Sequence, residues 1–268
     1  MNLSKEDAIY VSSVYEDYFS HLDRIDDYMR EQKLASLKDI PSNPLFPIED
    51  DLFSDFSMHP NDMDFSVVEI PNNQWETLLS ITSSHINIAP VGKNIKLAVI
   101  EKNTGKYVGF IRLGSPLINC KPRNEMLGQV FTQTIENAKI FNKTTLMGFV
   151  IVPSQPFGYN YLGGKLLSGI CTSHEVREMC NKKYDMNLCL FETTSLYGST
   201  KTVSQYDGMK PFIRFKGTTE SDFLPTMHGE PYEDLKDFVE SKVGKLVDDG
   251  VSSRKLKISQ RIIALTKQ

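Results

Sequence analysis

The sequence predicts an α/β fold: a mixed sheet flanked by helices, with an N-terminal helical arm and a basic C-terminal extension. Two observations predict the sheet. Apolar residues alternate on both sides of an Asn-Thr-Gly turn at 103–105, which indicates an antiparallel hairpin. The segment Gly148–Thr194 has the pattern of a strand, a loop, a helix and a strand, which requires two neighbouring parallel strands. A sheet that contains both kinds of pair is mixed.

Charge varies along the chain and supports a division into three parts: an acidic helical arm and connector at 1–64, the α/β domain at 65–225 and the extension at 226–268. Residues 1–66 hold fifteen acidic and five basic residues, a net charge of −10, whereas the whole chain carries −4. The remaining residues are therefore basic on balance, which suits contact with an anion. An arm that packs on a basic body explains the same asymmetry, so both interpretations stay open.

The arm begins with a helix. Residues 4–7 form a capping-box-like start, and apolar residues follow at helical spacing as far as Met29. This pattern predicts one amphipathic helix that ends near Leu37. The residues after it, up to Phe65, contain four prolines and many acids, which predicts an extended connector.

The α/β domain follows the connector. Its first predicted elements are a strand at 65–70, a short helix at 72–84 and the hairpin strands Ile95–Glu101 and Tyr107–Leu113. They are followed by a helix or insertion at 126–141, a buried strand at 145–154, a glycine loop at 155–165 with a helix behind it that ends near 185, and a buried strand Met186–Thr194. The last elements are a helical turn near 204–211, a final strand Phe212–Phe215 and, in the tail, a basic helix or strand at 250–268. Strands and helices alternate, as in an α/β fold.

The glycine loop contains the sequence FGYNYLGGK at 157–165. A glycine turn at the start of a helix presents unpaired backbone N–H groups at the positive end of the helix dipole, where anions bind. A tight strand-to-helix connection uses the same glycines without any ligand. The loop and residues 193–200 both follow the carboxyl ends of predicted strands, where ligands bind in such sheets. This position raises the support for a ligand to about that for a plain connection, so both interpretations stay open.

Composition argues against several classes of protein. The apolar runs are too short for a membrane span, and the acidic start lacks the apolar stretch of a signal peptide. The four cysteines (Cys120, Cys171, Cys180 and Cys189) form no CxxC pair, which predicts reduced thiols, a cytoplasmic protein and no metal site. No triad order, HExxH motif, Walker loop or deaminase set is present, which argues against a hydrolase or a zinc enzyme.

Four features between Gly148 and Gly217 carry a family resemblance: a strand that ends in Pro153, a loop into YLGGKLLSGI, a strand that ends in FETTSLYGST, and the Tyr-containing turn SQYDGMKPFIRFKG. Together with the hairpin, they resemble the GCN5-related N-acetyltransferase fold. More narrowly, they are similar to the phage Mom adenine-modification proteins and the Druantia anti-phage protein A family. The resemblance implies an acetyltransferase-like domain, a bacteriophage or anti-phage context in the host cytoplasm, and a nucleic-acid base as the acceptor in DNA modification.

The resemblance also implies an acyl donor, either acetyl-CoA or another of its kind. The glycine loop is the expected binding site for its phosphates. Gly158, Gly163, Gly164 and Lys165 are the residues expected to hold it. A side chain at these glycines would block the close approach of an anion.

Acyl transfer to an amine needs one group that protonates the leaving thiolate and one that takes a proton from the amine. Tyr197 and Tyr206 are the candidate acids, and Asp207 or Glu192 is the candidate base. Glu192 stands near the end of a predicted buried strand, where burial would raise the pKa of a carboxyl group.

The segment after that strand is basic. Its candidate nucleic-acid-binding residues are Lys201, Lys210, Arg214 and Lys216, with Tyr206, Phe212 and Phe215 between them. Cations neutralise phosphates, and aromatic rings stack on a base that has left the duplex. Lys201 and Arg214 are also candidate ion-pair partners of Glu192. The tail forms a second basic patch, with the solvated face of a terminal helix as its other interpretation.

The leading hypothesis is therefore a group transferase that acts on a nucleic-acid base. A non-catalytic DNA- or protein-binding module on the same fold is the first alternative. An ordinary small-molecule or protein N-acetyltransferase is the second. Retention of coenzyme A separates both enzymes from the module, and salt-sensitive DNA binding separates the first enzyme from the second.

Overall fold

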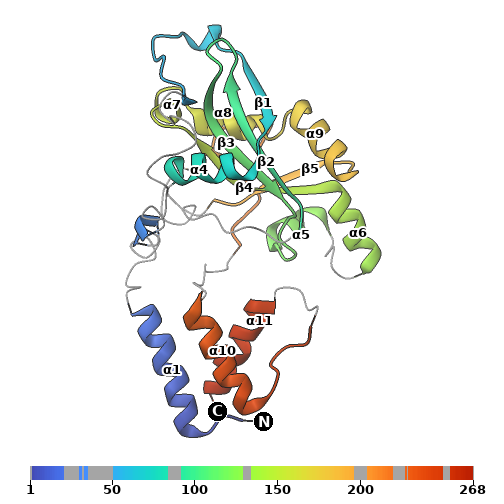
Figure 1. Ribbon diagram of the computed structural model, residues 1–268. Coiled ribbons are helices and arrows are strands. Elements are labelled where there is room, and N and C mark those ends of the chain that lie inside the picture. The colour runs from blue at the N-terminus through green and yellow to red at the C-terminus, as the bar shows by residue number, and fades with distance from the viewer. Residues whose placement is uncertain are drawn as a thin grey trace. The chain divides into compact units, whose positions relative to one another are not determined.

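Figure 1 shows the computed structural model, which describes residues 2–20, 30–31, 33–35, 51–83, 92–128, 134–195, 204–219, 227, 229–249 and 254–267. The chain forms two compact units. The first unit consists of Met1–Glu31 and Ser221–Gln268, and the second consists of Gln32–Glu220. The two ends of the chain thus belong to one unit. The three-part division with limits at 64 and 225 stays a prediction.

The second unit is built on a five-stranded sheet in the order β1-β2-β3-β4-β5. The strands are β1 (Phe65–Glu69), β2 (Asn94–Glu101), β3 (Lys106–Gly114), β4 (Thr145–Pro153) and β5 (Leu190–Thr193). The first four strands are antiparallel to their neighbours, and β5 is parallel to β4. The predicted hairpin, the predicted parallel pair and the mixed α/β sheet are confirmed.

One face of the sheet is covered by α4 (Asn72–Thr82), the predicted short helix (Figure 1). Its Trp75 is fully buried and packs edge-on against Phe110 of β3, with the ring centroids 6.0 Å apart. Leu78 and Leu79 join the same core. This burial of large apolar side chains stabilises the helix against the sheet.

The other face is covered by α8 (Gly163–Ile170) and α9 (His174–Tyr184) (Figure 1). Both helices contribute to the largest core of the unit. The sequence predicts one helix here, but the structure divides it at Ser173. The Ser173 hydroxyl accepts a hydrogen bond from the N–H of Val176 at 3.3 Å, so Ser173 caps the start of α9.

Shorter elements connect these layers. They are η1 (Pro60–Asp62), α5 (Lys121–Leu127), α6 (Ile135–Thr144) and α7 (Phe157–Asn160). The segment 126–141, predicted as a helix or an insertion, contains the end of α5 and most of α6. Gly128 ends α5 in the left-handed conformation, with φ of 68°.

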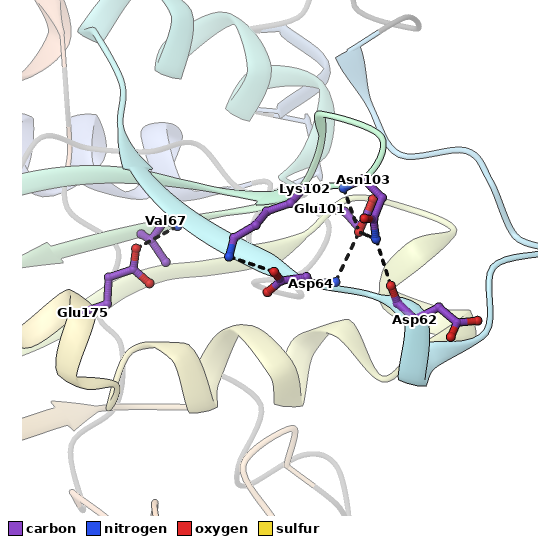
Figure 2. A network of polar contacts seen from close by, with 7 residues as sticks. All are labelled: Asp62, Asp64, Val67, Glu101, Lys102, Asn103 and Glu175. Carbon is purple, nitrogen blue, oxygen red and sulfur yellow. Dashed lines mark hydrogen bonds and ion pairs between the residues drawn. The ribbon is translucent and has the colours of Figure 1, made fainter.

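Figure 2 shows a polar network at the turn of the β2–β3 hairpin. The fully buried carboxylate of Glu101 accepts hydrogen bonds from backbone and side-chain groups of Asn103 and Thr104, and from the N–H of Asp64. Burial alone would raise the pKa of Glu101, but these hydrogen bonds hold it below its ordinary value. Lys102 and Asp64 form an ion pair beside it at 2.9 Å. Glu101 therefore fixes the turn to the start of β1.

β5 is shorter and more exposed than predicted. The sequence predicts a buried strand over Met186–Thr194, but only Leu190–Thr193 pair with β4, and these residues are half-buried. The N–H groups of Asn187 and Cys189 donate to carbonyls at the end of α6. Those donors are therefore not available to extend the strand.

The predicted strand Phe212–Phe215 is wrong. The N–H groups of Phe212 and Ile213 both donate to the carbonyl of Met209, at 2.9 and 3.2 Å, which closes a turn. Pro211 has no N–H to offer a neighbouring strand. The residues from 213 to 219 have no regular secondary structure. Strand alternation therefore does not determine the direction in which the Phe212 and Phe215 side chains point.

The first unit contains three helices among the residues described: α1 (Lys5–Phe19), α10 (Glu230–Val243) and α11 (Arg254–Thr266). They share one core, to which α1 contributes Val11 and α11 contributes Ile262. The basic tail, predicted as a helix or a strand, is therefore helical. The predicted N-terminal helix is confirmed over α1, whereas its continuation at 21–29 and the connector at 36–50 lie outside the described residues.

Candidate functional site

The glycine loop between β4 and α8 is filled by contacts within the protein. The ring of Phe157 is fully buried against that of Phe53, with the centroids 5.4 Å apart. A Cβ atom on Gly163 would lie 2.9 Å from the Cα of Gly158, and one on Gly158 would lie 2.5 Å from the Cγ of Pro153. These distances leave no space for a side chain: Gly163 is required where α8 approaches α7, and Gly158 where α7 approaches Pro153 at the end of β4.

Gly164 and Lys165 face the turn at 204–208. A Cβ atom on Gly164 would lie 3.4 Å from the side-chain oxygen of Gln205, so packing does not require this glycine. The ammonium group of Lys165 donates to the backbone carbonyls of Gln205 and Asp207. Lys165 therefore ties the start of α8 to the turn.

These contacts bear on the acyl donor that the resemblance implies. A cradle for its phosphates needs glycines beside open space and a cation that can turn toward the anion. Protein atoms fill that space at Gly158 and Gly163, and Lys165 has two carbonyl partners. These three residues, as they stand, do not fit a phosphate group. Gly164 alone among the four predicted residues has room around it.

Tyr206 lies in the turn that Lys165 holds, and its ring packs against the largest core. The Tyr206 hydroxyl is 3.2 Å from the Thr193 hydroxyl, which donates to the carbonyl of Gly148 at 3.0 Å. Burial raises the pKa of Tyr206, and the hydrogen bonds with Thr193 and Gln205 offset part of this rise. The phenol therefore keeps its proton at neutral pH and links the turn to β5.

Glu192 forms a buried ion pair with Arg123. The Arg123 Nη1 is 2.9 Å from the Glu192 Oε1, and the two side chains are 4% and 15% exposed. Arg123 also donates to the carbonyls of Leu117 and Ile118 and lies over the ring of Phe141 at 4.5 Å. Burial raises the pKa of Glu192, and Arg123 offsets part of the rise. The Glu192 Oε2 is buried and has no hydrogen-bond partner among the described residues.

The predicted acids and bases that the structure describes, Tyr206, Asp207 and Glu192, lie in two separate places. Consecutive residues of a strand point to opposite faces of the sheet. Thr193 contacts Tyr206 on one face, so Glu192 and its partner Arg123 lie on the other. Asp207 is exposed, and its carboxylate accepts the N–H of Ser204 at 2.9 Å within the turn. The structure thus brings Tyr206, Asp207 and Lys165 together and leaves Glu192 apart from them.

Residues 210–216, which we call the basic aromatic segment, lie on the surface. The side chains of Phe212 and Phe215 are 70% and 79% exposed. Lys210, Arg214 and Lys216 are also exposed. Two aromatic side chains and three cations therefore reach solvent from one short segment.

Both ends of this segment are anchored. Met209, at its start, is buried, and its Cε would lie 3.8 Å from a Cβ on Gly169 of α8. Gly217, at its end, has φ of 137° and approaches α5, since a Cβ there would lie 3.2 Å from the Cβ of Pro122. The segment therefore runs between two fixed points and presents its side chains from a held backbone.

Two predicted site residues, Tyr197 and Lys201, lie outside the described residues, and their roles stay predictions. Within the described part of the chain, no group of three His, Cys, Asp or Glu side chains is placed to hold a metal ion. All four cysteines are free thiols. None of the helices among those residues has the length and apolar character that crossing a membrane requires.

The sequence prediction lacks two residues that organise these sites, Arg123 and Thr193. Arg123 takes the place that the sequence offers to Lys201 or Arg214 as the partner of Glu192, from 69 positions away. No local pattern indicates a pair at that distance. Thr193 adjoins Glu192, and strand alternation alone would have placed it on the opposite face.

Comparison with known proteins identifies the family. A family model for the Druantia protein DruA matches residues 48–208. The matched residues include all five strands, the glycine loop and the Tyr206 turn. No curated protein and no solved structure matches this chain. Because the family model covers more than half of the sequence, this protein belongs to the Druantia protein DruA family.

Proposed function

We propose that this protein acts in defence against phage by binding single-stranded nucleic acid through the basic aromatic segment. Membership of the DruA family supports the anti-phage role. One observation carries the binding proposal: two highly exposed Phe side chains lie among three exposed cations in a segment anchored at both ends.

Each component of that segment matches a component of a single strand. Unpaired bases stack on aromatic rings, and this contact contributes about 1–3 kcal/mol per base. The cations of Lys210, Arg214 and Lys216 neutralise phosphates along the same strand. Anchoring at Met209 and Gly217 lowers the conformational entropy that binding would otherwise cost. The proposed ligand is therefore a single strand read by stacking and charge, without a fixed sequence.

The test measures the affinity of the full chain for a fluorescent single-stranded DNA by anisotropy over a series of salt concentrations. The double variant Phe212→Ala/Phe215→Ala is expected to bind at least about thirtyfold more weakly, because two stacking contacts are lost. The triple variant Lys210→Gln/Arg214→Gln/Lys216→Gln is expected to lower the dependence of log affinity on log salt by about two units.

Two matched controls lie in the same unit. Tyr159→Ala removes an aromatic side chain that is 86% exposed on the glycine loop. Lys139→Gln/Lys143→Gln/Lys182→Gln removes three exposed lysines from α6 and α9. Both controls are expected to bind like the unmodified chain. Equal losses in the controls, or unchanged binding in both segment variants, would refute the proposal.

We also propose that the sheet follows the acetyltransferase-like plan. Its support is the parallel β4–β5 pair, joined through the glycine loop and two helices. β4 also continues from Phe149 to Pro153 beyond Gly148, the last of its residues that pairs with β5. The two strands therefore part at the end that meets the glycine loop.

Group transfer to a nucleic-acid base is the second candidate function. The observation in its favour is Glu192, a buried carboxyl group with a raised pKa and an Oε2 that has no hydrogen-bond partner among the described residues. Such a group suits a general base. It ranks second because Arg123 already pairs with the other oxygen and because the glycine loop does not fit a donor phosphate.

Mass spectrometry of nucleosides tests this second function. DNA from cells that express the protein is compared with DNA from cells that express the Glu192→Gln variant and from cells with an empty vector. A modified nucleoside that requires Glu192 would support group transfer. Identical nucleosides in all three samples would argue against group transfer and leave binding as the one remaining candidate function.

A further inference from the structure

The three helices of the first unit differ sharply in charge. α1 carries four acidic residues and one basic residue, and α10 carries five acidic and two basic residues. α11, with the sequence RKLKISQRIIALT, carries four basic residues and no acidic one. A helix without a single carboxylate, in a unit otherwise rich in them, has a surface suited to an anionic partner.

α11 presents two distinct faces. Ile258, Ile262 and Leu265 are buried in the core of the unit. The opposite face carries Lys257, Gln260, Arg261 and Ala264, and Lys267 in the turn directly after the helix continues it; all five are exposed. These positions recur at intervals of three and four residues, so they lie along one side of the helix. We call them the outer face of α11.

The four cations of α11, together with Lys267 directly after it, divide in the same way. Arg254 pairs with Asp249 at 2.6 Å, and Lys255 lies over the ring of Tyr232 at 4.3 Å. By contrast, Lys257, Arg261 and Lys267 form no ion pair with any described carboxylate. The outer face thus holds three cations that have no ion-pair partner among the described carboxylates.

We propose that the outer face of α11 binds the backbone and groove of double-stranded nucleic acid. An α-helix fits the major groove of DNA, and Lys and Arg side chains on one side of it reach phosphates and base edges. The small Ala264 lets the helix approach closely. α11 has no aromatic residue, so this surface cannot stack on unpaired bases as the basic aromatic segment would. The proposal goes beyond the single-strand function and does not depend on it.

The geometry differs from a helix-turn-helix motif. That motif joins its two helices by a turn of about three or four residues. The connection from the end of α10 at Val243 to the start of α11 at Arg254 is longer. α11 therefore binds as a basic helix supported by α1 and α10, without a second helix placed across the backbone.

A second copy of this chain is the competing partner, since α1 and α10 are acidic. The carboxylates of those helices are already partly neutralised within the unit: Lys236 pairs with Glu233 and Asp237, and Lys242 pairs with Asp7. A duplex presents one charge for about every 1.7 Å of its axis. This denser charge favours nucleic acid as the partner.

The test uses the full chain, a fluorescent DNA duplex of arbitrary sequence and anisotropy over a series of salt concentrations. The variant Lys257→Gln/Arg261→Gln/Lys267→Gln is expected to bind at least about tenfold more weakly and to lower the salt dependence by about two to three units. Glutamine forms helices well, so α11 should stay folded, which circular dichroism at 222 nm verifies.

The matched control is Lys236→Gln/Lys242→Gln/Lys245→Gln. It removes the same charge from the same unit, but its lysines pair with carboxylates. The control is expected to keep most of the duplex affinity. An equal loss in the control, or an unchanged salt dependence in the α11 variant, would refute the proposal. A change from dimer to monomer in analytical ultracentrifugation, with duplex affinity unchanged, would assign the outer face to a second copy.

The two proposals fail separately. Phe212→Ala/Phe215→Ala is expected to weaken single-strand binding and to leave the duplex salt dependence intact. If it changes neither, while the α11 variant loses duplex affinity, only the single-strand proposal is lost. If the Phe212→Ala/Phe215→Ala variant loses single-strand affinity while the α11 variant keeps its duplex affinity, only the α11 proposal is lost.

Discussion

The glycine loop and the basic aromatic segment both suggest anion binding in the sequence, but their environments differ. In the loop, Gly158 and Gly163 pack against each other, and Lys165 is held by two backbone carbonyls. In the segment, Phe212 and Phe215 are exposed, and the flanking Met209 and Gly217 approach Gly169 of α8 and Pro122 of α5. Glycines that allow two helices to approach have the same sequence signature as glycines that bind a phosphate. What fills the space beside them decides between the two roles.

The strongest test of this contrast is Gly163→Val. A branched side chain there meets the Cα of Gly158 and the ring of Phe157, so we expect a loss of about 3 kcal/mol in unfolding free energy. Trp75, the single tryptophan of the chain, is buried in the same unit, so its fluorescence during urea unfolding reports this loss. A stable variant would mean that the space is open and would restore the loop as a ligand cradle.

The next effect concerns Lys165→Met. Two backbone carbonyls of the turn lose a charged donor, which should cost about 1.5 kcal/mol and loosen the turn. Hydrogen exchange measures the loosening at the N–H of Asp207, which now donates to the carbonyl of Ser204. Lys182→Met, on the exposed side of α9, is the control and should change neither quantity. If the exchange rate at Asp207 stays the same, Lys165 is available for a ligand after all.

Tyr206→Phe gives a smaller and pH-dependent effect. At pH 7 the variant loses the contact with Thr193, which should cost about 1 kcal/mol. Because burial raises the pKa of Tyr206, the unfolded phenol ionises before the folded one, so rising pH above about 10 favours unfolding of the unmodified protein. The variant lacks this phenol. The stability difference should therefore shrink as pH rises beyond about 10, as urea unfolding at pH 7 and near pH 10.5 would reveal. A constant difference would contradict a buried phenol.

The smallest effect is expected for Gly164→Ala. The new Cβ would contact only the flexible side chain of Gln205, and alanine favours the helical conformation. The unfolding free energy, measured through Trp75, should change by no more than about 0.5 kcal/mol. A large loss would place Gly164 with Gly158 and Gly163 as a packing glycine and would leave the loop without any open position.

The sequence predicts those parts of the fold whose signals are local. The hairpin follows from alternation around a short glycine turn, and α1 follows from apolar spacing and its capping residue Ser4. β5 is predicted too long because its first N–H groups bond to the end of α6, which local sequence does not reveal. The predicted strand Phe212–Phe215 is wrong because its alternation is local, whereas the N–H groups of Phe212 and Ile213 close a turn onto Met209 and none of the described strands pairs with it.

The candidate sites follow the same rule. The sequence shows that cations and aromatic residues lie close together in the segment 210–216. It does not show that their side chains are exposed. The partner of Glu192 depends on the position of α5 in the tertiary structure, which brings the Arg123 Nη1 to 2.9 Å from the Glu192 Oε1. The separation of Glu192 from Tyr206 arises because the Glu192 side chain points to one face of β5 and Tyr206 packs on the other. These relations belong to the tertiary structure and leave no mark within a short window of residues.

The shared core of α1, α10 and α11 has a consequence for how the protein is made. A ribosome releases α1 first and α11 last, so the apolar stripe around Val11 waits for its partners while the rest of the chain is synthesised. At about 5–20 residues per second, that interval is roughly ten to fifty seconds. The second unit is contiguous, at Gln32–Glu220. Chain growth therefore sets an order: the sheet can fold while α1 still lacks its partners, and a product that ends before α10 leaves that stripe exposed to aggregation.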